Sequence, residues 1–232
     1  MFNIVCVKWG TKYGPEYVNN LYMGVKRNLT LPFAFYCFTE NSTNLHADIK
    51  ILPICSDLKL TRPQYDGWWY KLEMFRPNNG LTGQVFYLDL DTVVVGNIDD
   101  IVSKTRGFVI LRDFYRSVRD PNAGQSSLLA WPAGACDHLY TEFMKDPEGV
   151  MRANPGGDQN WMEKQQPNRT YWQDLFPDQV VSFKVHCVDK KDRHTWRNGS
   201  ILPVNTRVVC FHGPPRPHEV ANHDWMRKHW RG

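Results

Sequence analysis

The 232-residue sequence contains no apolar run that approaches the roughly 18–20 residues a membrane-spanning helix requires. Its first ten residues, MFNIVCVKWG, lack the basic start and the small-residue cleavage site of a secretory leader, and we expect a strand there instead. No internal repeat and no low-complexity block is present. These absences, with a length that allows one sizeable core, predict a single domain over residues 1–232.

The cysteines show no C-x-x-C spacing, and four of the six lie within apolar, strand-like runs: IVCV, FYCF, VHCV and VVCF. We therefore predict buried, reduced thiols in a cytoplasmic protein, rather than disulfides or a zinc site. Charge of one sign is not in large excess either, because 28 basic residues face 24 acidic ones for a net charge of +4. That balance favours anionic partners slightly and does not by itself argue for nucleic-acid binding.

Short β-rich apolar runs alternate with helical patterns along the chain, which predicts an α/β protein with a largely parallel sheet. The first helix has Pro15 at its start and four apolar side chains on one face. Strands are expected at 2–8, 33–39, 49–54, 84–90, 107–113, 126–132, 180–186 and 207–213. Helices are expected at 15–28, 68–75, 136–144 and 156–164.

Asp89 and Asp91 interrupt the apolar stretch VFYLDLDTVVVG, which otherwise reads as a buried strand. On an extended chain the two side chains would share a face about 6.6 Å apart along the backbone. Two bare carboxylates at that separation repel by roughly 0.6–2.5 kcal/mol, whereas one divalent cation would bind both. A solvated strand end is the alternative. Ligands of α/β sheets gather at the carboxyl ends of strands, which favours a metal site.

A second candidate segment is RVVCFHGPPRPHE, residues 207–219, in which a strand pattern leads to His212 and Gly213. Imidazole is a good ligand for transition ions, and glycine lets the backbone approach a phosphate. Arg216 offers a planar fork suited to phosphate oxygens. A proline-rich surface turn with an incidental histidine is the alternative.

The segment WWYKLEMFRPNNGLTGQVFYLDLDTVVVGNIDDI, residues 68–101, resembles the central segment of family 8 glycosyltransferases. The late HGPPRPH partly matches the His-Gly-x-x-Lys-Pro-Trp segment of that family, and NAGQSSLLAW and GGDQNW fall between them in order. Arg216 stands where the family has lysine and His218 where it has tryptophan, so the resemblance is to a divergent member. It implies a GT-A fold: one Rossmann-like mixed sheet flanked by helices. Residues 1–120 would then bind nucleotide sugar and metal, and residues 121–232 would bind the acceptor and carry the C-terminal metal and diphosphate loop.

By that resemblance Asp89, Asp91 and His212 would hold Mn²⁺ or Mg²⁺, and the ion would bind the diphosphate of a nucleotide sugar. The other contacts that the resemblance implies are residues of the first loop, one helix lysine and the late loop. They are Val7, Lys8, Gly10 and Tyr13 for the nucleotide, Lys71 for donor phosphate or sugar, and Gly213 and Arg216 for the diphosphate. An ordinary strand-to-helix turn and a solvated helix lysine are the alternatives for the first two groups.

NPGGDQNW, residues 154–161, places Asp158 and Gln159 at a helix start. A capping aspartate there would stabilise the helix by roughly 0.5–2 kcal/mol, and the resemblance instead puts this pair beside the reacting sugar. Asn122, Gln125 and Ser126 fall where the family's middle strand approaches the donor sugar.

The expected function is metal-dependent transfer of a hexose from a nucleotide-diphosphate sugar, UDP-glucose or UDP-galactose by resemblance, with retention of configuration. A nucleotidyltransferase is a rival, but VKWGTKYG lacks the glycine-rich basic loop it needs. A non-catalytic binding module is another. A glycan, a lipid-linked glycan, a protein and a nucleic acid all stay open as acceptors, and so does the oligomeric state. The basic, tryptophan-containing tail 218–232 either touches a membrane surface peripherally or packs on the body.

Overall fold

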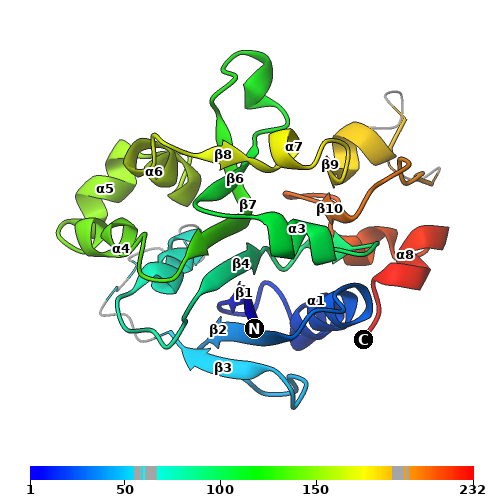
Figure 1. Cartoon of the computed structure of the whole chain (residues 1–232), viewed down its shortest axis with the longest axis horizontal. Coiled ribbons are helices and arrows are strands. Elements are labelled where there is room, and N and C mark those ends of the chain that lie inside the picture. Colours follow the sequence, from blue (N-terminus) through cyan, green and yellow to red (C-terminus); the bar gives the residue numbers. More distant parts are fainter. Residues whose placement is uncertain (55–57, 59, 61–66, 190–195, 197–198) are drawn as a thin grey trace.

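The structure, a computed structural model, describes residues 1–54, 58, 60, 67–189, 196 and 199–232. Its largest layer is a seven-stranded sheet in the order β3-β2-β1-β4-β7-β6-β8 (Figure 1). Neighbouring strands are parallel except at β7, which runs antiparallel to β4 and β6. The strands are β1 Phe2–Lys8, β2 Phe33–Thr39, β3 Lys50–Pro53, β4 Gln84–Leu88, β6 Val109–Arg112, β7 Gly124–Pro132 and β8 Thr170–Tyr171. The mixed sheet that the resemblance implied is confirmed.

The two faces of this sheet carry different apolar clusters, because side chains alternate along each strand. Ile4 and Cys6 of β1 belong to one cluster and Val5 to the other. The first face is covered by α1 Pro15–Asn28, α3 Asp99–Lys104 and α7 Trp172–Leu175. The second is covered by η1 Gly67–Phe75, α4 His138–Phe143, α5 Pro147–Ala153 and α6 Asp158–Gln165. Helices on both faces of a largely parallel sheet are the α/β arrangement that the sequence predicts.

A second, three-stranded sheet lies beside the large one in the order β5-β10-β9. It is formed by β5 Thr92–Val94, β9 Val180–Ser182 and β10 Val208–Cys210, and the sequence pattern did not separate it from the main sheet. One face shares the α1 cluster through Val94 and Val208. The other packs on α8 Asp224–His229 with Phe183, Phe211 and Trp225. This sheet brings the late loop of the chain next to the aspartates that follow β4.

Local sequence accounts for α1, whose bounds match the predicted 15–28. Pro15 opens the helix, since its missing N–H and fixed φ suit the first turn. Lys26 and Arg27 lie in the last turn, where cations stabilise the helix dipole. The apolar face is buried as the spacing predicts.

Four predicted elements differ from the structure at functionally placed positions. The 207–213 strand ends at Cys210, so His212 and Gly213 lie in the loop that follows it. The 68–75 helix is a 3₁₀ helix, η1, so its side chains repeat every three residues. The 84–90 strand ends at Leu88, since the chain turns there and the Thr92 N–H donates to the Asp89 carbonyl at 3.0 Å. The 180–186 strand is wrong beyond Ser182. The Ser182 hydroxyl caps the backbone there, and the chain continues as the π-helical turn η3 Phe183–Cys187.

The C-terminal segment packs on the body, which is the alternative to a membrane-contacting tail. Trp225 is buried against Phe183 and Phe211, and Trp230 lies 5.4 Å from the Tyr17 ring. Peripheral membrane contact stays a prediction without support from this packing. Among the helices of the described ranges, none has the length and apolar character needed to cross a bilayer.

The burial predicted for the thiols is confirmed for the described cysteines. Cys6, Cys37, Cys136, Cys187 and Cys210 are buried and free. Cys55 lies outside the described residues.

Candidate active site

The candidate site lies at the edge of the large sheet where β1 and β4 end. Because β7 is antiparallel to β4, its first residues reach the same edge, and the Asp89 N–H donates to the Ser127 carbonyl at 2.9 Å. The end of β10 joins them through the Phe211 N–H, which donates to the Asp91 carbonyl at 3.3 Å. Segments far apart in sequence therefore meet at the carboxyl ends of parallel strands, where α/β proteins bind ligands.

Asp91 is the more deeply buried of the two aspartates after β4, at 6% exposure. One of its oxygens accepts a hydrogen bond from the Tyr13 hydroxyl at 3.1 Å, and the Gly213 backbone also donates to it. Burial and then the charge of Asp89 raise the pKa of Asp91 from 3.8 to about 6. A desolvated carboxylate beside another carboxylate stabilises a bound cation.

Lys71 bridges the carboxylates of the site. Its ammonium lies 2.9 Å from Asp89 Oδ1 and 3.7 Å from Asp158 Oδ2, and it donates to Ser126 Oγ at 3.2 Å. Burial alone would lower the pKa of Lys71, but Asp158 and Asp89 together raise it above its ordinary value. Lys71 is thus a charged, fixed group and not a solvated surface lysine.

Asp158 is the first residue of α6, and Gly157 occupies the N-cap position. The buried Asp158 carboxylate accepts a hydrogen bond from Ser126 Oγ at 2.6 Å. Burial raises the pKa of Asp158, and Lys71 and Ser126 offset part of that rise. The carboxylate therefore faces the site rather than capping its own helix.

Arg216 closes the site on the side of Tyr13. Its guanidinium lies 5.2 Å from the centroid of the Tyr13 ring. Arg216 Nε is buried without a hydrogen-bond partner. An unpartnered buried donor costs about 1–3 kcal/mol, more when charged, so this atom suits an anionic ligand.

His212 follows β10 but turns its ring toward other groups. Its Nε2 lies 2.6 Å from Ser182 Oγ, and the ring stacks on Phe114 at 5.7 Å. Burial lowers the pKa of His212 to about 4, so the ring is neutral near pH 7. Within the ranges that the structure describes, no three His, Cys, Asp or Glu side chains are grouped to hold a metal. Asp89 and Asp91 fit a hard divalent cation by their oxygen donors, and the third ligand stays a prediction.

The other predicted nucleotide contacts line the turn after β1. The Lys8 ammonium is buried and donates to the Gly10 carbonyl at 3.3 Å. The Gly10 N–H donates to Glu40 at 2.7 Å, and its φ of +61° favours glycine at this position. Val7 precedes them on β1 and is half-buried. The structure places these residues beside the site without testing their role.

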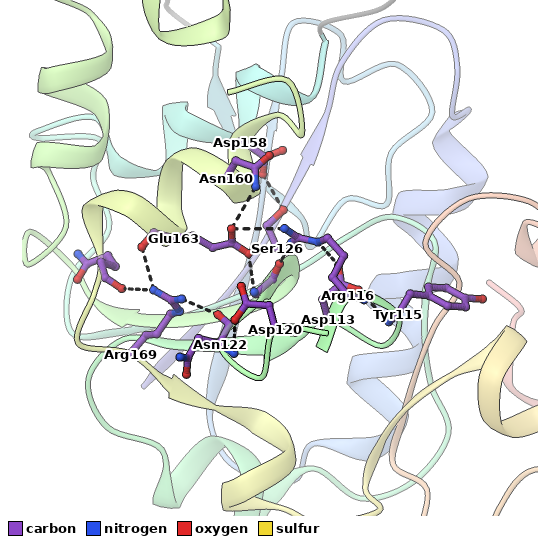
Figure 2. A network of polar contacts seen from close by, with 12 residues as sticks. Asp113, Tyr115, Arg116, Asp120, Asn122, Ser126, Asp158, Asn160, Glu163 and Arg169 are labelled. Carbon is purple, nitrogen blue, oxygen red and sulfur yellow. Dashed lines mark hydrogen bonds and ion pairs between the residues drawn. The ribbon is translucent and has the colours of Figure 1, made fainter. Parts of the chain in front are cut away.

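The predicted donor-sugar contacts on β7 and α6 differ in whether they lie next to Lys71 and Asp158. Ser126 contacts both Lys71 and Asp158, as above, and the buried Gln125 Oε1 has no hydrogen-bond partner. Gln159 follows Asp158 and is half-buried. Asn122 is exposed, and its carbonyl accepts hydrogen bonds from Arg169 at 2.6 Å and Tyr171 at 2.7 Å, at a different point of the polar network from Asp158 (Figure 2).

Lys184 is a candidate site residue that the sequence does not reveal, because the pattern predicts a strand over residues 180–186. The π-helical turn η3 directs its ammonium to the His212 carbonyl, at 3.1 Å. Burial lowers the pKa of Lys184, and Asp91 opposes the shift. Single π-helical turns are frequent at functional sites, but this one leaves no pattern in the sequence.

A polar network behind the site fixes α6 against β7 (Figure 2). The Glu163 carboxylate accepts hydrogen bonds from Arg116 at 2.8 Å and from the Gly124 N–H at 2.5 Å. Arg116 also bonds Asp113 at 2.9 Å. Since α6 begins at Asp158 and β7 carries Ser126, this network holds the two ends of the 2.6 Å hydrogen bond in register.

We expect Glu163→Gln to lower the free energy of unfolding by about 1–3 kcal/mol. The neutral amide loses the charge that faces Arg116, and its NH₂ group replaces the oxygen that accepts hydrogen bonds from Arg116 and Asn160. Urea denaturation would measure the loss. Glu142→Gln, which breaks the exposed pair with Lys145, should change stability by less than about 0.5 kcal/mol. Equal losses in the two variants would contradict a structural role for the Glu163 network.

The large mixed sheet flanked by helices matches the GT-A type of glycosyltransferase fold. One solved structure with this fold is the galactosyltransferase LgtC in complex with donor and acceptor sugar analogs. It has a TM-score of 0.63 and 12% identity over 97% of this chain and 93% of that chain. An active-site mutant of LgtC gives 0.65 and 11% with the same coverage. No family model and no curated protein matches the sequence. At this identity the likeness establishes the fold.

Proposed function

We propose that this chain is a glycosyltransferase that moves a hexose from a nucleotide-diphosphate sugar, UDP-glucose or UDP-galactose, to an acceptor. The observation that supports it best is the Lys71 ammonium held between Asp89 and Asp158, at the ligand-binding edge of a GT-A fold. The LgtC structure contains donor and acceptor sugar analogs, and we extend that substrate class to this chain as a family 8-like, divergent relative.

The diphosphate would lie between Asp91 and the late loop. Arg216 Nε supplies an unpartnered donor there, and the Gly213 φ of +97° allows a close backbone approach. Lys184 adds a second fixed positive charge next to Gly213. Tyr13, Lys8, Gly10 and Val7 would receive the nucleotide.

Asp89 and Asp91 would hold Mn²⁺ or Mg²⁺, and the ion would neutralise negative charge on the leaving diphosphate. His212 would complete that set if its ring left Ser182. The protein groups Arg216, Lys184 and Lys71 would stabilise the same charge from fixed positions.

The sugar would lie over Lys71 and Asp158. For a reaction with retention, a leaving phosphate oxygen takes the proton of the acceptor, and no strong protein base is needed. Asp158, oriented by Ser126, would stabilise positive charge on the sugar, with Gln159, Gln125 and Asn122 as further contacts. In an inverting reaction Asp158 would be the general base. We assign most of the donor and metal contacts to residues 1–120. Residues 121–232 would supply acceptor contacts together with the late loop that binds metal and diphosphate.

A thermal-shift panel of nucleotide sugars with and without Mn²⁺ tests this proposal. At a ligand concentration of 100 Kd a single bound ligand stabilises by about 2.7 kcal/mol, or roughly 5–10 °C in Tm for a chain of this size. We expect such a shift with one UDP-sugar and Mn²⁺, and its loss after EDTA. Detectable hydrolysis of that sugar would exclude a non-catalytic binding module.

Asp100→Asn is the matched control for Asp91→Asn at the site, because the exposed Asp100 carboxylate pairs with Lys104 away from the site. It should preserve the shift. No stabilisation by any nucleotide sugar would overturn the proposal, and a shift with a nucleoside triphosphate instead would favour a nucleotidyltransferase.

A further inference from the structure

Trp68 is the one tryptophan of the nine that is exposed, at 45%, and all nine lie in the described part of the chain. The next residue, Trp69, is buried and stacks on Phe143 with centroids 5.1 Å apart. Burying an indole stabilises a fold strongly, so an indole left in solvent beside a buried one is available to a ligand.

The period of η1 fixes where Trp68 points. In a 3₁₀ helix side chains three residues apart eclipse, so Trp68 shares a face with Lys71, about 6 Å along the axis. The Gly67 and Tyr70 face is covered by Trp9, whose ring stacks on Tyr70 at 4.9 Å. The face of η1 that bears the site ammonium is therefore the face that bears the exposed indole.

Gly157 places the same indole beside Asp158. A Cβ added to Gly157 would lie 2.5 Å from Trp68 Nε1, so the ring edge rests directly on this backbone. The Gly157 φ of +82° independently favours glycine. Trp68 thus adjoins the N-terminus of α6, where the carboxylate of Asp158 meets Lys71.

The position of Trp68 relative to the other site residues indicates whether its ring contacts the sugar donor or the acceptor. The contacts of the site form a row. At one end the Tyr13 ring lies against Arg216 and its hydroxyl bonds Asp91. Lys71 pairs with Asp89 and, further along, with Asp158. Trp68 adjoins Asp158 at the other end. The donor diphosphate belongs with the cations at the first end, so the second end is left for the group that attacks the sugar.

We propose that Trp68 is the platform on which a pyranose ring of the acceptor stacks, beside Asp158. This inference rests on the proposed transfer reaction and identifies the acceptor as a saccharide. One face of a pyranose presents C–H groups that pack on an indole, and its hydroxyls reach neighbouring carboxylates. Among the acceptor classes that the sequence leaves open, a glycan fits an exposed indole next to an acid best.

A glycan array probed with the wild-type protein in UDP and Mn²⁺ tests the platform. We expect binding to one or more glycans, and a loss of about tenfold in affinity for those glycans in Trp68→Ala. Trp68→Phe keeps a flat aromatic ring and should recover part of the loss. Leu175→Ala, an apolar side chain of similar exposure at 42% on α7, should bind as wild type does.

Three results would overturn the proposal: no glycan bound by the wild type, equal binding by Trp68→Ala, or a weaker UDP-sugar thermal shift in Trp68→Ala. The last would place the indole on the donor. A failed UDP-sugar shift in the wild type would instead count against the transferase, so the two failures are distinguishable. Thermal unfolding of each variant would confirm that it folds.

Discussion

Asp91→Asn is expected to lower glycosyl transfer by on the order of 10³-fold, since it removes one of two carboxylates that would hold the divalent cation. Asparagine has nearly the same shape and still accepts the hydrogen bond from the Tyr13 hydroxyl. The variant therefore changes the charge at this position and leaves the packing intact. Loss of activity would report on the ion and not on the fold.

The same substitution should not destabilise the ligand-free protein. Burial and Asp89 raise the pKa of Asp91 from 3.8 to about 6. A carboxyl whose pKa is raised on folding stabilises the fold at pH below its unfolded value, and that contribution is lost as pH rises through 6. At pH 7 the ionised carboxylate is a cost, and asparagine removes it. We expect an unchanged or higher Tm, with a gain of up to about 3 kcal/mol.

Metal-dependent turnover and calorimetric Tm, measured side by side, would check both halves of this expectation. Asp100→Asn on α3 is the matched control and should change neither quantity. Asp91→Asn with full activity would remove this aspartate from the metal site. A large drop in its Tm would mean that the ionised carboxylate stabilises the fold.

Lys71→Met is expected to lower the free energy of unfolding by about 3–5 kcal/mol at pH 7, as for one partner removed from a buried ion pair. Asp89 and Asp158 would both lose their cation, and methionine of similar length cannot replace it. Since domains are stable by about 5–15 kcal/mol, this is a large share of the total. Transfer activity should fall as well, because the charge next to the leaving group is lost.

Urea denaturation of Lys71→Met against Lys104→Met would isolate the effect of burial. Lys104 pairs with Asp100 on the surface, and its loss should cost less than about 1 kcal/mol. The double variant Lys71→Met with Asp158→Asn should recover part of the stability, since it removes one stranded charge. Equal effects of the two lysine variants would show that Lys71 is solvated in solution.

Much of the site could be found in the sequence because its parts are short motifs that follow strand patterns. Asp89 and Asp91 are conspicuous within an apolar run, and Asp158 follows two glycines. Their convergence could not be found there. On sequence grounds Lys71 is either a solvated lysine or a ligand contact. Only the fold shows that its ammonium lies 3.7 Å from the carboxylate of Asp158, 87 residues later. Lys184 was missed since a π-helical turn has no periodic pattern.

The predicted metal ligands Asp89, Asp91 and His212 show that the sequence does not determine the direction of a side chain. A histidine after a strand is a reasonable ligand on sequence grounds, but the side-chain direction depends on its neighbours. In the fold the His212 ring bonds Ser182 and stacks on Phe114, and both residues come from segments distant in sequence. Their contact could not be predicted before the second sheet was known.

The sequence by itself determined the α/β class, the positions of α1, β1 and β2, and the acids of the site, because side-chain periodicity and helix-start residues act over a few neighbours. Tertiary structure alone decided the antiparallel β7, the second sheet, the ion pairs of Lys71 and the exposure of Trp68. Each of these depends on strand pairing and burial between segments tens of residues apart, and no local preference encodes which distant partner a side chain will meet.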